Sequence, residues 1–334
     1  MADRTILYLP TASLSLDILS KRAKATLESL GKVIWTAGDR AYSAEELPRL
    51  LPGVEAVVTS WGSPAFTPEA IAAADRLRII GHAAGTVKHL VPEEGYRRGI
   101  TVLSGAAVIA DGVAEYTLWA MLSMQRDLYR YQKRMKEERG WRRSGDGWAH
   151  ELYYGKVGIV AASMVGRRVI ELLRPFRCEV MVYDPYLSEQ AAAELGVRKV
   201  DLDELMRTSD IVSDHAPVTR ETQGLLGAAQ FRLMKDGALF INTARAWTLD
   251  EEALLAELRT GRIRAVLDVF DREPLAPDSS FRDLDNVLLT PHVAGSTTEL
   301  RLRLVEAIAE DMARFFSGEQ PRLAVSWNRL RIMA

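Results

Sequence analysis

The sequence is short of the features that mark secreted, membrane-spanning and nucleic-acid-binding proteins. Its single cysteine, Cys178, excludes an internal disulfide and is expected to be a buried, small hydrophobic residue. No apolar run approaches the ~20 residues needed to span a bilayer, and the first residues begin a strand pattern instead of a secretory signal. The 43 Lys and Arg residues nearly balance 45 Asp and Glu, so no basic surface for nucleic acid or anionic membrane is expected. We therefore expect a cytoplasmic protein without a metal site.

Length and composition predict two α/β domains. A chain of 334 residues exceeds the size at which one core usually suffices, and 48% apolar residues can fill two. Short apolar runs alternate with amphipathic stretches, which is typical of doubly wound parallel sheets. Strands are expected at 5–9, 33–35, 56–59, 77–81 and 101–103, and helices at 16–30, 109–135 and 299–316. A polar, Gly-rich loop at 140–148 precedes a second alternating unit, which runs from Lys156 to about Ala294.

Three polar residues in the last third of the chain each follow a short apolar run. They are Arg245 in the segment 240–245, Glu273 in 267–275 and His292 in 288–296. Residues are presented in this way at the ends of buried parallel strands, where ligands of open α/β sheets bind. Taken singly, each has a plainer interpretation: a solvated arginine, a loop glutamate before proline, and a histidine that ends a strand.

Together the three residue types describe an acid–base site for a 2-hydroxy or 2-keto acid. The planar guanidinium of Arg245 is suited to a two-pronged grip on a carboxylate. The imidazole of His292 can protonate the oxygen that becomes an alkoxide when hydride arrives, and can take the proton back in the reverse reaction. A carboxylate that is hydrogen-bonded to the second ring nitrogen, the one that does not face the substrate, fixes the tautomer of the imidazole. Glu273 is the candidate for this carboxylate.

Further short motifs occur in a fixed order along nearly the whole chain. They are Val113–Glu115, Gly155–Val160, Tyr183–Pro185, Ser209–Ser213, His215–Pro217, Met234–Ala238, Asn242–Arg245, Asp268–Phe270 with Glu273–Pro274, and Pro291–His292. With them the chain resembles the D-isomer-specific 2-hydroxyacid dehydrogenases, which include D-lactate, D-glycerate/hydroxypyruvate and D-3-phosphoglycerate dehydrogenases. The resemblance implies that Arg245 anchors the substrate, Glu273 is the relay carboxylate and His292 is the acid/base. It also implies two Rossmann-like domains and a homodimer.

The same resemblance places an NAD-binding domain at 104–296, inserted in a substrate domain made of 1–103 and 297–334. The positions that it assigns to the cofactor are Ser163, Met164, Val165, Gly166, Asp184, His215, Ala216, Pro217, Thr243, Ala244 and Asp268. The positions that it assigns to the substrate are Arg245 and the backbone N–H groups of Ala83, Ala84 and Gly85. Nearby His82, Lys88 and His89 are either an additional anion site or solvated surface.

The cofactor loop departs from the expected Gly-x-Gly-x-x-Gly. The sequence after the strand 157–160 is Ala161–Gly166, and only the third glycine remains. Alanine at the first position is tolerable if its φ is negative. Ser163 at the second position either crowds the pyrophosphate or donates its hydroxyl to a phosphate oxygen at the helix N-terminus.

Asp184 favours NAD over NADP. It ends the apolar run 179–183 and lies 18 residues past Gly166, where an acid accepts hydrogen bonds from the adenosine ribose. A carboxylate there repels a 2′-phosphate; the plainer interpretation is an Asp-Pro turn. Two other departures are Asp214, where relatives place an apolar residue, and Ala246, where a glycine normally follows the arginine.

The sequence therefore predicts an NAD-dependent oxidoreductase that acts on a 2-hydroxy or 2-keto acid. A relative acting on formate would need no acid pair of this form, because no alkoxide has to be protonated. A non-catalytic regulatory protein that senses a dinucleotide remains the alternative, since it would explain the eroded glycine loop. A structural dimer partner without a ligand would explain neither the loop nor the Arg–Glu–His set.

Overall fold

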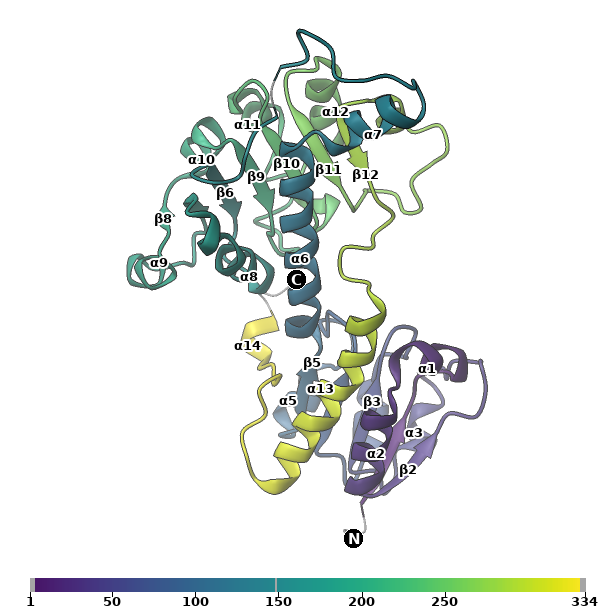
Figure 1. Cartoon of the computed structure of the whole chain (residues 1–334). Helices are drawn as coiled ribbons and strands as arrows, with labels where there is room; N and C mark the ends of the chain where they lie inside the picture. The colour runs from purple at the N-terminus through teal and green to yellow at the C-terminus, as the bar shows by residue number, and fades with distance from the viewer. Residues whose placement is uncertain (1–3, 148, 331–334) are drawn as a thin grey trace. The chain divides into compact units, whose positions relative to one another are not determined.

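The computed structural model describes residues 4–147 and 149–330, which fall into two compact units. One unit combines residues 1–109 and 296–334, and the other comprises 110–295. Each is built on a parallel sheet, as predicted, and the second is inserted in the sequence of the first (Figure 1). Among the described helices, none is both long and apolar enough to cross a membrane. The assignment of cofactor and substrate roles to 104–296 and to 1–103 plus 297–334 stays a prediction.

The first unit has a five-stranded sheet in the order β2-β1-β3-β4-β5, with every neighbouring pair parallel. Its strands are β1 (Thr5–Tyr8), β2 (Lys32–Trp35), β3 (Ala56–Thr59), β4 (Ile79–His82) and β5 (Thr101–Ser104). Alternate side chains enter different cores because successive residues of a strand point to opposite faces. Ile6 and Val58 pack in one core, whereas Leu7 and Val57 pack in the other.

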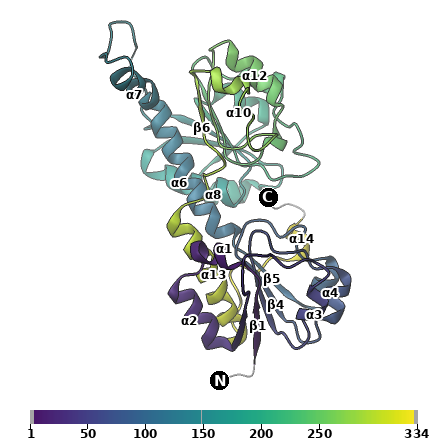
Figure 2. The same cartoon turned by 90° about the vertical axis from the view of Figure 1, so that its right-hand side faces the viewer.

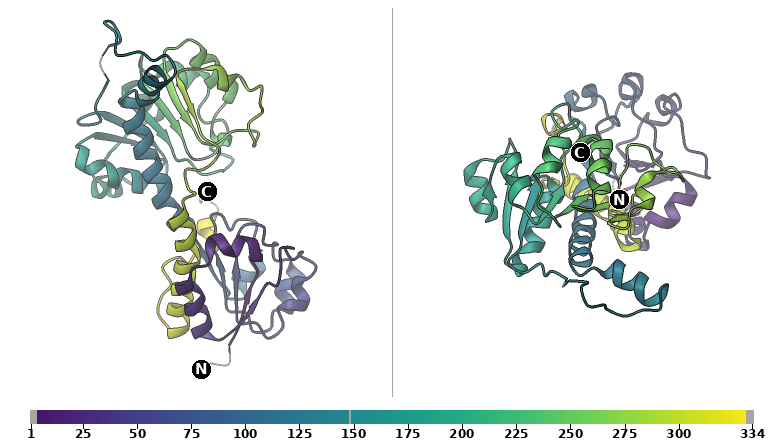
Figure 3. Two further views of the ribbon diagram at one scale, coloured as in Figure 1. Left: turned by 45° about the vertical axis from the view of Figure 1, so that its right-hand side comes forward. Right: turned by 90° about the horizontal axis from the view of Figure 1, so that it is seen from above.

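Helices cover both faces of this sheet (Figure 2). The core with Ile6 is closed by α1 (Ala12–Ile18), α2 (Lys21–Leu30) and α13 (Thr298–Ser317). The opposite core is closed by α3 (Leu47–Leu50), α4 (Pro68–Ala73), α5 (Glu93–Arg97) and α14 (Trp327–Leu330). Figure 3 shows the yellow α13 beside the purple N-terminal helices, so the two ends of the chain build one core.

The second unit has a seven-stranded sheet in the order β12-β11-β10-β9-β6-β7-β8, again parallel throughout. Its strands are β6 (Lys156–Val160), β7 (Glu179–Tyr183), β8 (Arg198–Lys199), β9 (Ile211–Asp214), β10 (Leu239–Asn242), β11 (Arg264–Leu267) and β12 (Val287–Leu289). The strand order reverses direction between β6 and β9. Ligands of doubly wound sheets bind at such a switch point, outside the carboxyl ends of the strands.

Two helical layers enclose the second sheet. Residues of α6 (Ala106–Gln125), α8 (Met164–Leu173) and α9 (Glu189–Leu195) pack on one face. Residues of α10 (Leu202–Thr208), α11 (Ala228–Leu233) and α12 (Glu251–Arg259) pack on the other. The remaining elements are α7 (Leu128–Lys136) and the short 3-10 helices η1 (Arg174–Phe176), η2 (Ala246–Thr248) and η3 (Ser280–Asp283).

Two predicted helices are each broken in two. The stretch 16–30 divides before Ser20, whose side chain caps α2 by accepting from the Ala23 N–H. The stretch 109–135 divides at Asp127, which has a left-handed φ of 51° and separates α6 from α7. The Asp127 carboxylate is ion-paired with Arg130 and Arg264. Aspartate tolerates this backbone better than most residues, so the break needs neither Gly nor Pro.

Cys178 is half-buried, not fully buried as predicted. Its Sγ contacts the carbonyl oxygen of Leu152 at 3.2 Å, and burial raises the pKa of the thiol. A thiol with a raised pKa is a poor nucleophile, because the thiolate is the reactive form.

Candidate active site

The register of the second sheet brings the predicted cofactor positions to one edge. Val160 pairs with both Tyr183 and Asp214, Asp214 pairs with Asn242, and Asn242 pairs with Leu267 at the end of β11. The segments that follow these strands therefore leave the sheet side by side. They contain Ser163, Met164, Val165, Gly166, Asp184, His215, Ala216, Pro217, Thr243, Ala244, Arg245 and Asp268.

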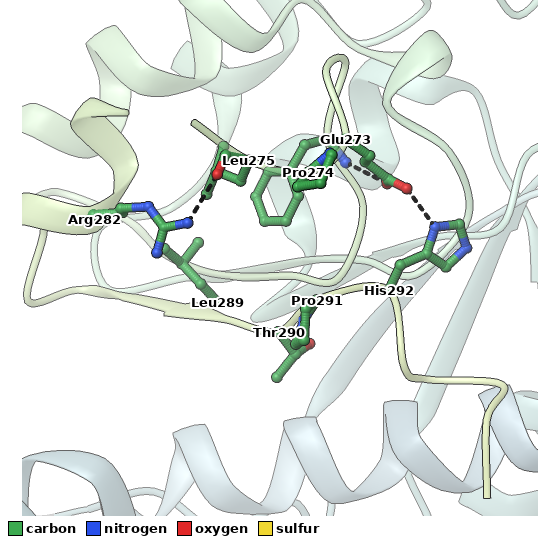
Figure 4. Close-up of a pocket in the computed structure, with 9 residues that line it drawn as sticks. Glu273, Pro274, Leu275, Arg282, Leu289, Thr290, Pro291 and His292 are labelled. Atoms are coloured by element: carbon green, nitrogen blue, oxygen red, sulfur yellow. Dashed lines mark hydrogen bonds and ion pairs between the residues drawn. The ribbon is translucent and has the colours of Figure 1, made fainter. Parts of the chain in front are cut away.

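His292 and Glu273 form a close side-chain pair at this edge (Figure 4). Nδ1 of His292 lies 2.7 Å from Oε2 of Glu273. The other carboxylate oxygen of Glu273 accepts the N–H of Phe270 at 3.0 Å, which fixes the carboxylate as well. Because one ring nitrogen faces the carboxylate, Nε2 is the nitrogen left to exchange a proton with a ligand.

The surroundings of Glu273 favour its ionised form. Partial burial opposes ionisation, but hydrogen bonds from His292 and the Phe270 N–H, with the positive charges of His292 and Arg245, outweigh burial and lower the pKa of Glu273. Arg245 therefore lies close enough to act electrostatically on the Glu273 carboxylate.

The backbone that carries Arg245 is strongly held, whereas its side chain is exposed. Asn242, which is fully buried, accepts the Ala244 N–H at 2.9 Å and donates Nδ2 to the Arg245 carbonyl at 3.2 Å. The guanidinium itself donates only to the neighbouring Ala244 carbonyl among the described residues, at 2.6 Å. The arginine is thus available for an anion. Ala246, buried at the start of η2, takes the place of the expected glycine there.

A network that the sequence did not reveal supports the segment carrying His292. The carboxylate of Asp268 is buried and accepts from the Thr290 hydroxyl at 2.6 Å and from two N–H groups, those of Val293 and Ala294, at 2.9 Å. The Tyr116 hydroxyl from α6 lies 2.6 Å from the Thr290 hydroxyl. His292 adopts a left-handed φ of 55°, and its N–H donates to the Asp268 carbonyl at 2.8 Å. Asp268 thus orients the loop that carries His292. This role is independent of the contact with the cofactor that the resemblance implies for Asp268.

A cavity of about 580 Å³ adjoins the His292–Glu273 pair (Figure 4). Apart from the pair, its walls are mostly apolar: Phe270, Pro274, Leu275, Leu289 and Pro291, together with Thr290 and Arg282. The Arg282 guanidinium is occupied by the carbonyls of Ala276 and Leu275, each at 2.9 Å. These walls keep one side of the acid–base pair in an apolar environment.

The condition set for an alanine in the cofactor loop is not met. Ala161 has a φ of 70°, so it does not adopt the negative φ at which alanine would be tolerable. A left-handed conformation costs an L-residue other than Gly about 1–2 kcal/mol. The third glycine is needed for another reason: a Cβ on Gly166 would lie 2.2 Å from the Ala161 carbonyl oxygen. The loop therefore has the left-handed turn that the first glycine of the motif favours, although alanine occupies that position.

Ser163 caps the helix that follows this loop. Its hydroxyl oxygen accepts the Gly166 N–H at 3.3 Å, which leaves its proton free for another acceptor. Among the described residues, none accepts from the N–H groups of Met164 and Val165. Free N–H groups at the start of a ten-residue helix attract an anion. The altered loop therefore still fits a pyrophosphate.

Asp184 also belongs to this loop. One of its oxygens accepts the Ala162 N–H at 2.9 Å and the other accepts the Tyr186 N–H at 2.8 Å. Each carboxylate oxygen has a second lone pair, so ribose hydroxyls can still be bound. Arg167, which sequence reasoning missed, donates Nε to the Ala162 carbonyl at 2.9 Å and steadies the loop from the helix side.

His215 lies in the segment after β9 and is buried. Its Nε2 contacts the Ser213 hydroxyl at 2.9 Å, while Nδ1 has no partner among the described residues. Burial lowers the pKa of His215 to about 3, so the ring is neutral. A neutral, buried imidazole with a free nitrogen suits a packing surface beside a ligand better than an anion site.

The loop of the first unit that is predicted to bind the substrate has two backbone N–H groups without an acceptor among the described residues. The Ala83 N–H is already donated to the Thr59 carbonyl at 2.8 Å. Among the described residues, none accepts from the N–H groups of Ala84 and Gly85. His82 is buried and not part of a solvated surface, and burial lowers its pKa to about 4. It therefore adds no positive charge for an additional anion.

The strain at Ala161 gives a first prediction. Ala161→Gly should increase the free energy of unfolding by up to about 1 kcal/mol, because relief of the left-handed conformation exceeds the ~0.4–1 kcal/mol entropic cost of glycine in the unfolded chain. Ala162→Gly is the matched control, since Ala162 has no positive φ and its buried methyl group would only be lost. Urea denaturation measures both. A less stable Ala161→Gly variant would contradict the strain.

Comparisons of the chain with known proteins agree with this geometry. The model of the family described as "D-isomer specific 2-hydroxyacid dehydrogenase, NAD binding domain" matches residues 118–294. A D-3-phosphoglycerate dehydrogenase of Archaeoglobus fulgidus is 36% identical over 285 residues, which are 85% of this chain and 54% of the relative. A glyoxylate reductase of Pyrococcus furiosus is 31% identical over 301 residues, or 88% of this chain and 89% of the relative.

The fold is also found among solved structures. A phosphoglycerate oxidoreductase from Rhizobium etli superposes with a TM-score of 0.82 and 27% identity, covering 96% of this chain and 98% of the other. The chain spans little more than half the length of the D-3-phosphoglycerate dehydrogenases of Archaeoglobus fulgidus and Methanocaldococcus jannaschii, 54% and 57% respectively.

Proposed function

Because the chain belongs to the family of D-isomer-specific 2-hydroxyacid dehydrogenases and contains that family's NAD-binding domain, we propose that it is an NAD-dependent oxidoreductase acting on a 2-hydroxy or 2-keto acid. The observation that carries the proposal is the His292–Glu273 pair, 2.7 Å apart and within electrostatic reach of Arg245. This is the residue set needed to hold a carboxylate and to exchange a proton beside it.

When bound, NADH would supply the hydride that C2 of the 2-keto acid accepts. Arg245 holds the substrate carboxylate with two parallel N–H donors, which its exposed guanidinium can provide. In the first unit, the free N–H groups of Ala84 and Gly85 remain candidates for binding a carboxylate, as the resemblance implies.

His292 donates the proton to the carbonyl oxygen from Nε2. Glu273 accepts from Nδ1, so it keeps the ring in the orientation that presents Nε2 and compensates the positive charge of the imidazolium. In the reverse direction the same nitrogen takes the proton from the hydroxyl group. The Ser163 hydroxyl, the free N–H groups of α8 and Asp184 would hold the cofactor's pyrophosphate and ribose.

Consumption of NADH across a panel of 2-keto acids tests the proposal. Glyoxylate, hydroxypyruvate, pyruvate, phenylpyruvate and 2-ketoglutarate cover small, polar, aromatic and dicarboxylic side chains. Turnover of at least one is expected. Demonstrable NAD binding without turnover of any would favour the regulatory protein, the alternative that the altered Ala161 and Ser163 loop raises.

NADH should be preferred over NADPH because Asp184 would face a phosphate dianion. Asp184→Asn should reduce the ratio of the NADPH and NADH dissociation constants by at least about tenfold, since a charged hydrogen bond is lost for one cofactor and a repulsion is relieved for the other. Asp278→Asn is the control, because Asp278 is exposed. Titration by tryptophan fluorescence measures both constants. Equal constants in the unaltered protein would remove Asp184 from the ribose site.

Assembly and location complete the proposal. Large apolar side chains are exposed along α6, α7 and the loop after them: Trp119, Leu128, Tyr129, Met135 and Trp141. Such a surface is typical of a protein interface, and it supports a homodimer, which light scattering of the purified chain tests. A cytoplasmic location accords with the nearly balanced charge and the lone half-buried cysteine, and fractionation of cells tests it.

A further inference from the structure

A buried carboxyl group lies behind the turn that carries Arg245. Asp214 is the last residue of β9, and its side chain is fully buried. One oxygen, Oδ1, accepts the Ala216 N–H at 3.0 Å, and the other contacts the Thr248 hydroxyl. Among the described residues, no Lys or Arg forms an ion pair with it. A buried carboxylate without a cation is costly, so the group needs another explanation.

The number of available protons supplies that explanation. The Thr248 hydroxyl oxygen lies in contact with Oδ2 of Asp214 and also 2.8 Å from the carbonyl oxygen of Arg245. A hydroxyl has one proton, so it cannot donate to two acceptors at full strength. If Asp214 is protonated, its O–H donates to Thr248, and the Thr248 O–H donates to the Arg245 carbonyl. Each polar atom in this series of hydrogen bonds, from the Asp214 carboxyl group through the Thr248 hydroxyl to the Arg245 carbonyl, then has a partner.

The Arg245 carbonyl is where this chain of hydrogen bonds ends. It also accepts from Nδ2 of Asn242 at 3.2 Å and from the Thr248 N–H at 3.4 Å. Of the three donors, the Thr248 hydroxyl is the nearest. The peptide group of Arg245, and hence the starting point of its side chain, therefore depends on the proton that Asp214 supplies.

We infer that Asp214 is a buried neutral acid that acts through Thr248 as a positioning residue for Arg245. The hydrogen-bond chain itself is independent of function; only the statement that Arg245 holds a substrate carboxylate rests on the proposed function. Asp214 is one of the positions at which the sequence departs from the pattern of the family that it resembles, and these hydrogen bonds give the departure a purpose.

The groups around Asp214 agree with a neutral acid. Val160 of β6 and Asn242 of β10, which flank it in the sheet, and Thr248 of η2 carry no charge. His215, next in sequence, is neutral because burial lowers its pKa to about 3, and the Arg245 guanidinium is turned to its own neighbour, Ala244.

The direction of the pH dependence follows from burial. Burial raises the pKa of Asp214 to about 6, although the hydrogen bonds from Thr248 and Ala216 oppose the rise. The folded state thus binds a proton that the unfolded state has released, so this contribution to stability declines as pH rises from the unfolded pKa of about 4 to the folded value. Above about pH 6, Asp214 ionises, Thr248 turns its proton to the carboxylate, and the Arg245 carbonyl loses its nearest donor.

Infrared spectroscopy tests the protonation without any substrate. The difference between the spectra of the unaltered protein and Asp214→Asn, taken below pH 6, should contain the C=O band of a protonated carboxyl group, and the band should fade above that pH. The difference is needed because burial also raises the pKa of Glu251. A difference spectrum without this band would overturn the inference.

Kinetics with a 2-keto acid test the positioning. Asparagine imitates the neutral acid: its NH₂ donates to Thr248 and its oxygen accepts from Ala216. Asp214→Asn should therefore keep the KM that the unaltered enzyme has below pH 6, and should remove the rise in KM above it. Thr248→Val, which keeps the shape and loses the hydroxyl, should raise KM about 3–10-fold with little change in kcat, the effect of one lost hydrogen bond. Thr248→Ser is the matched control and should resemble the unaltered enzyme.

The outcomes separate this inference from the proposed function. If Asp214→Asn raises KM as much as Thr248→Val, Asp214 acts as an ionised acceptor and the inference is wrong. If the carboxyl band is present but no 2-keto acid is reduced, the hydrogen-bond chain stands and the proposed function fails.

Discussion

His292→Ala is expected to lower kcat by about 10²–10⁴-fold, the usual effect of removing a positioned acid/base, and to leave NADH affinity nearly unchanged. The proton for the substrate oxygen would then have to come from water. Stopped-flow oxidation of NADH measures the loss, and fluorescence titration measures cofactor binding. His150→Ala is a matched control, because His150 is an exposed histidine outside this site. Turnover of His292→Ala at the unaltered rate would remove His292 from the mechanism.

Glu273, the partner of His292, determines how the activity should depend on pH. The pKa of Glu273 is lowered in the folded protein, so its carboxylate stays ionised through the neutral range. Its contribution to stability is present above the unfolded pKa and is lost as pH falls through the lower folded pKa. The orientation of His292 should therefore fail only on the acid side.

The strands were the most predictable part of the fold. The segments 56–59 and 179–183 coincide with β3 and β7, because a strand covered on both faces is a continuous apolar run with clear ends. Helix ends were harder to predict. The break at Asp127 has a local ion pair with Arg130 and a second one with Arg264, which is 137 residues away in sequence, so the local pattern shows only part of its environment.

The candidate site divides in the same way. Arg245, Glu273 and His292 were predictable because each follows an apolar run and has a residue type with one evident chemical use. The residues that hold these three in position could not be predicted from the sequence. Thr248 meets Asp214 across 34 residues, and Tyr116 meets Thr290 across 174. Hydroxyl groups of this kind have many uses, so only the fold identifies their partners.

Arg245→Gln should reduce kcat/KM by about 10²–10⁴-fold, since two hydrogen bonds to a charged group are lost and each contributes roughly 1.5–3 kcal/mol. Arg245→Lys should recover part of the loss, because it restores the charge without the two-pronged geometry, and its remaining defect should appear mainly in KM. Steady-state kinetics on the best substrate of the panel separate the two parameters.

A second readout distinguishes the loss of a substrate anchor from general damage to the fold. The charge of Arg245 helps to lower the pKa of Glu273, so its removal moves that pKa towards the ordinary value, and the acid-side fall of kcat moves to higher pH. Arg207→Gln is the matched control, because Arg207 is an exposed arginine on α10. Unaltered kinetics in Arg245→Gln would show that another group holds the carboxylate. A loss of activity without a shift of the acid limb would instead place Arg245 out of electrostatic reach of Glu273.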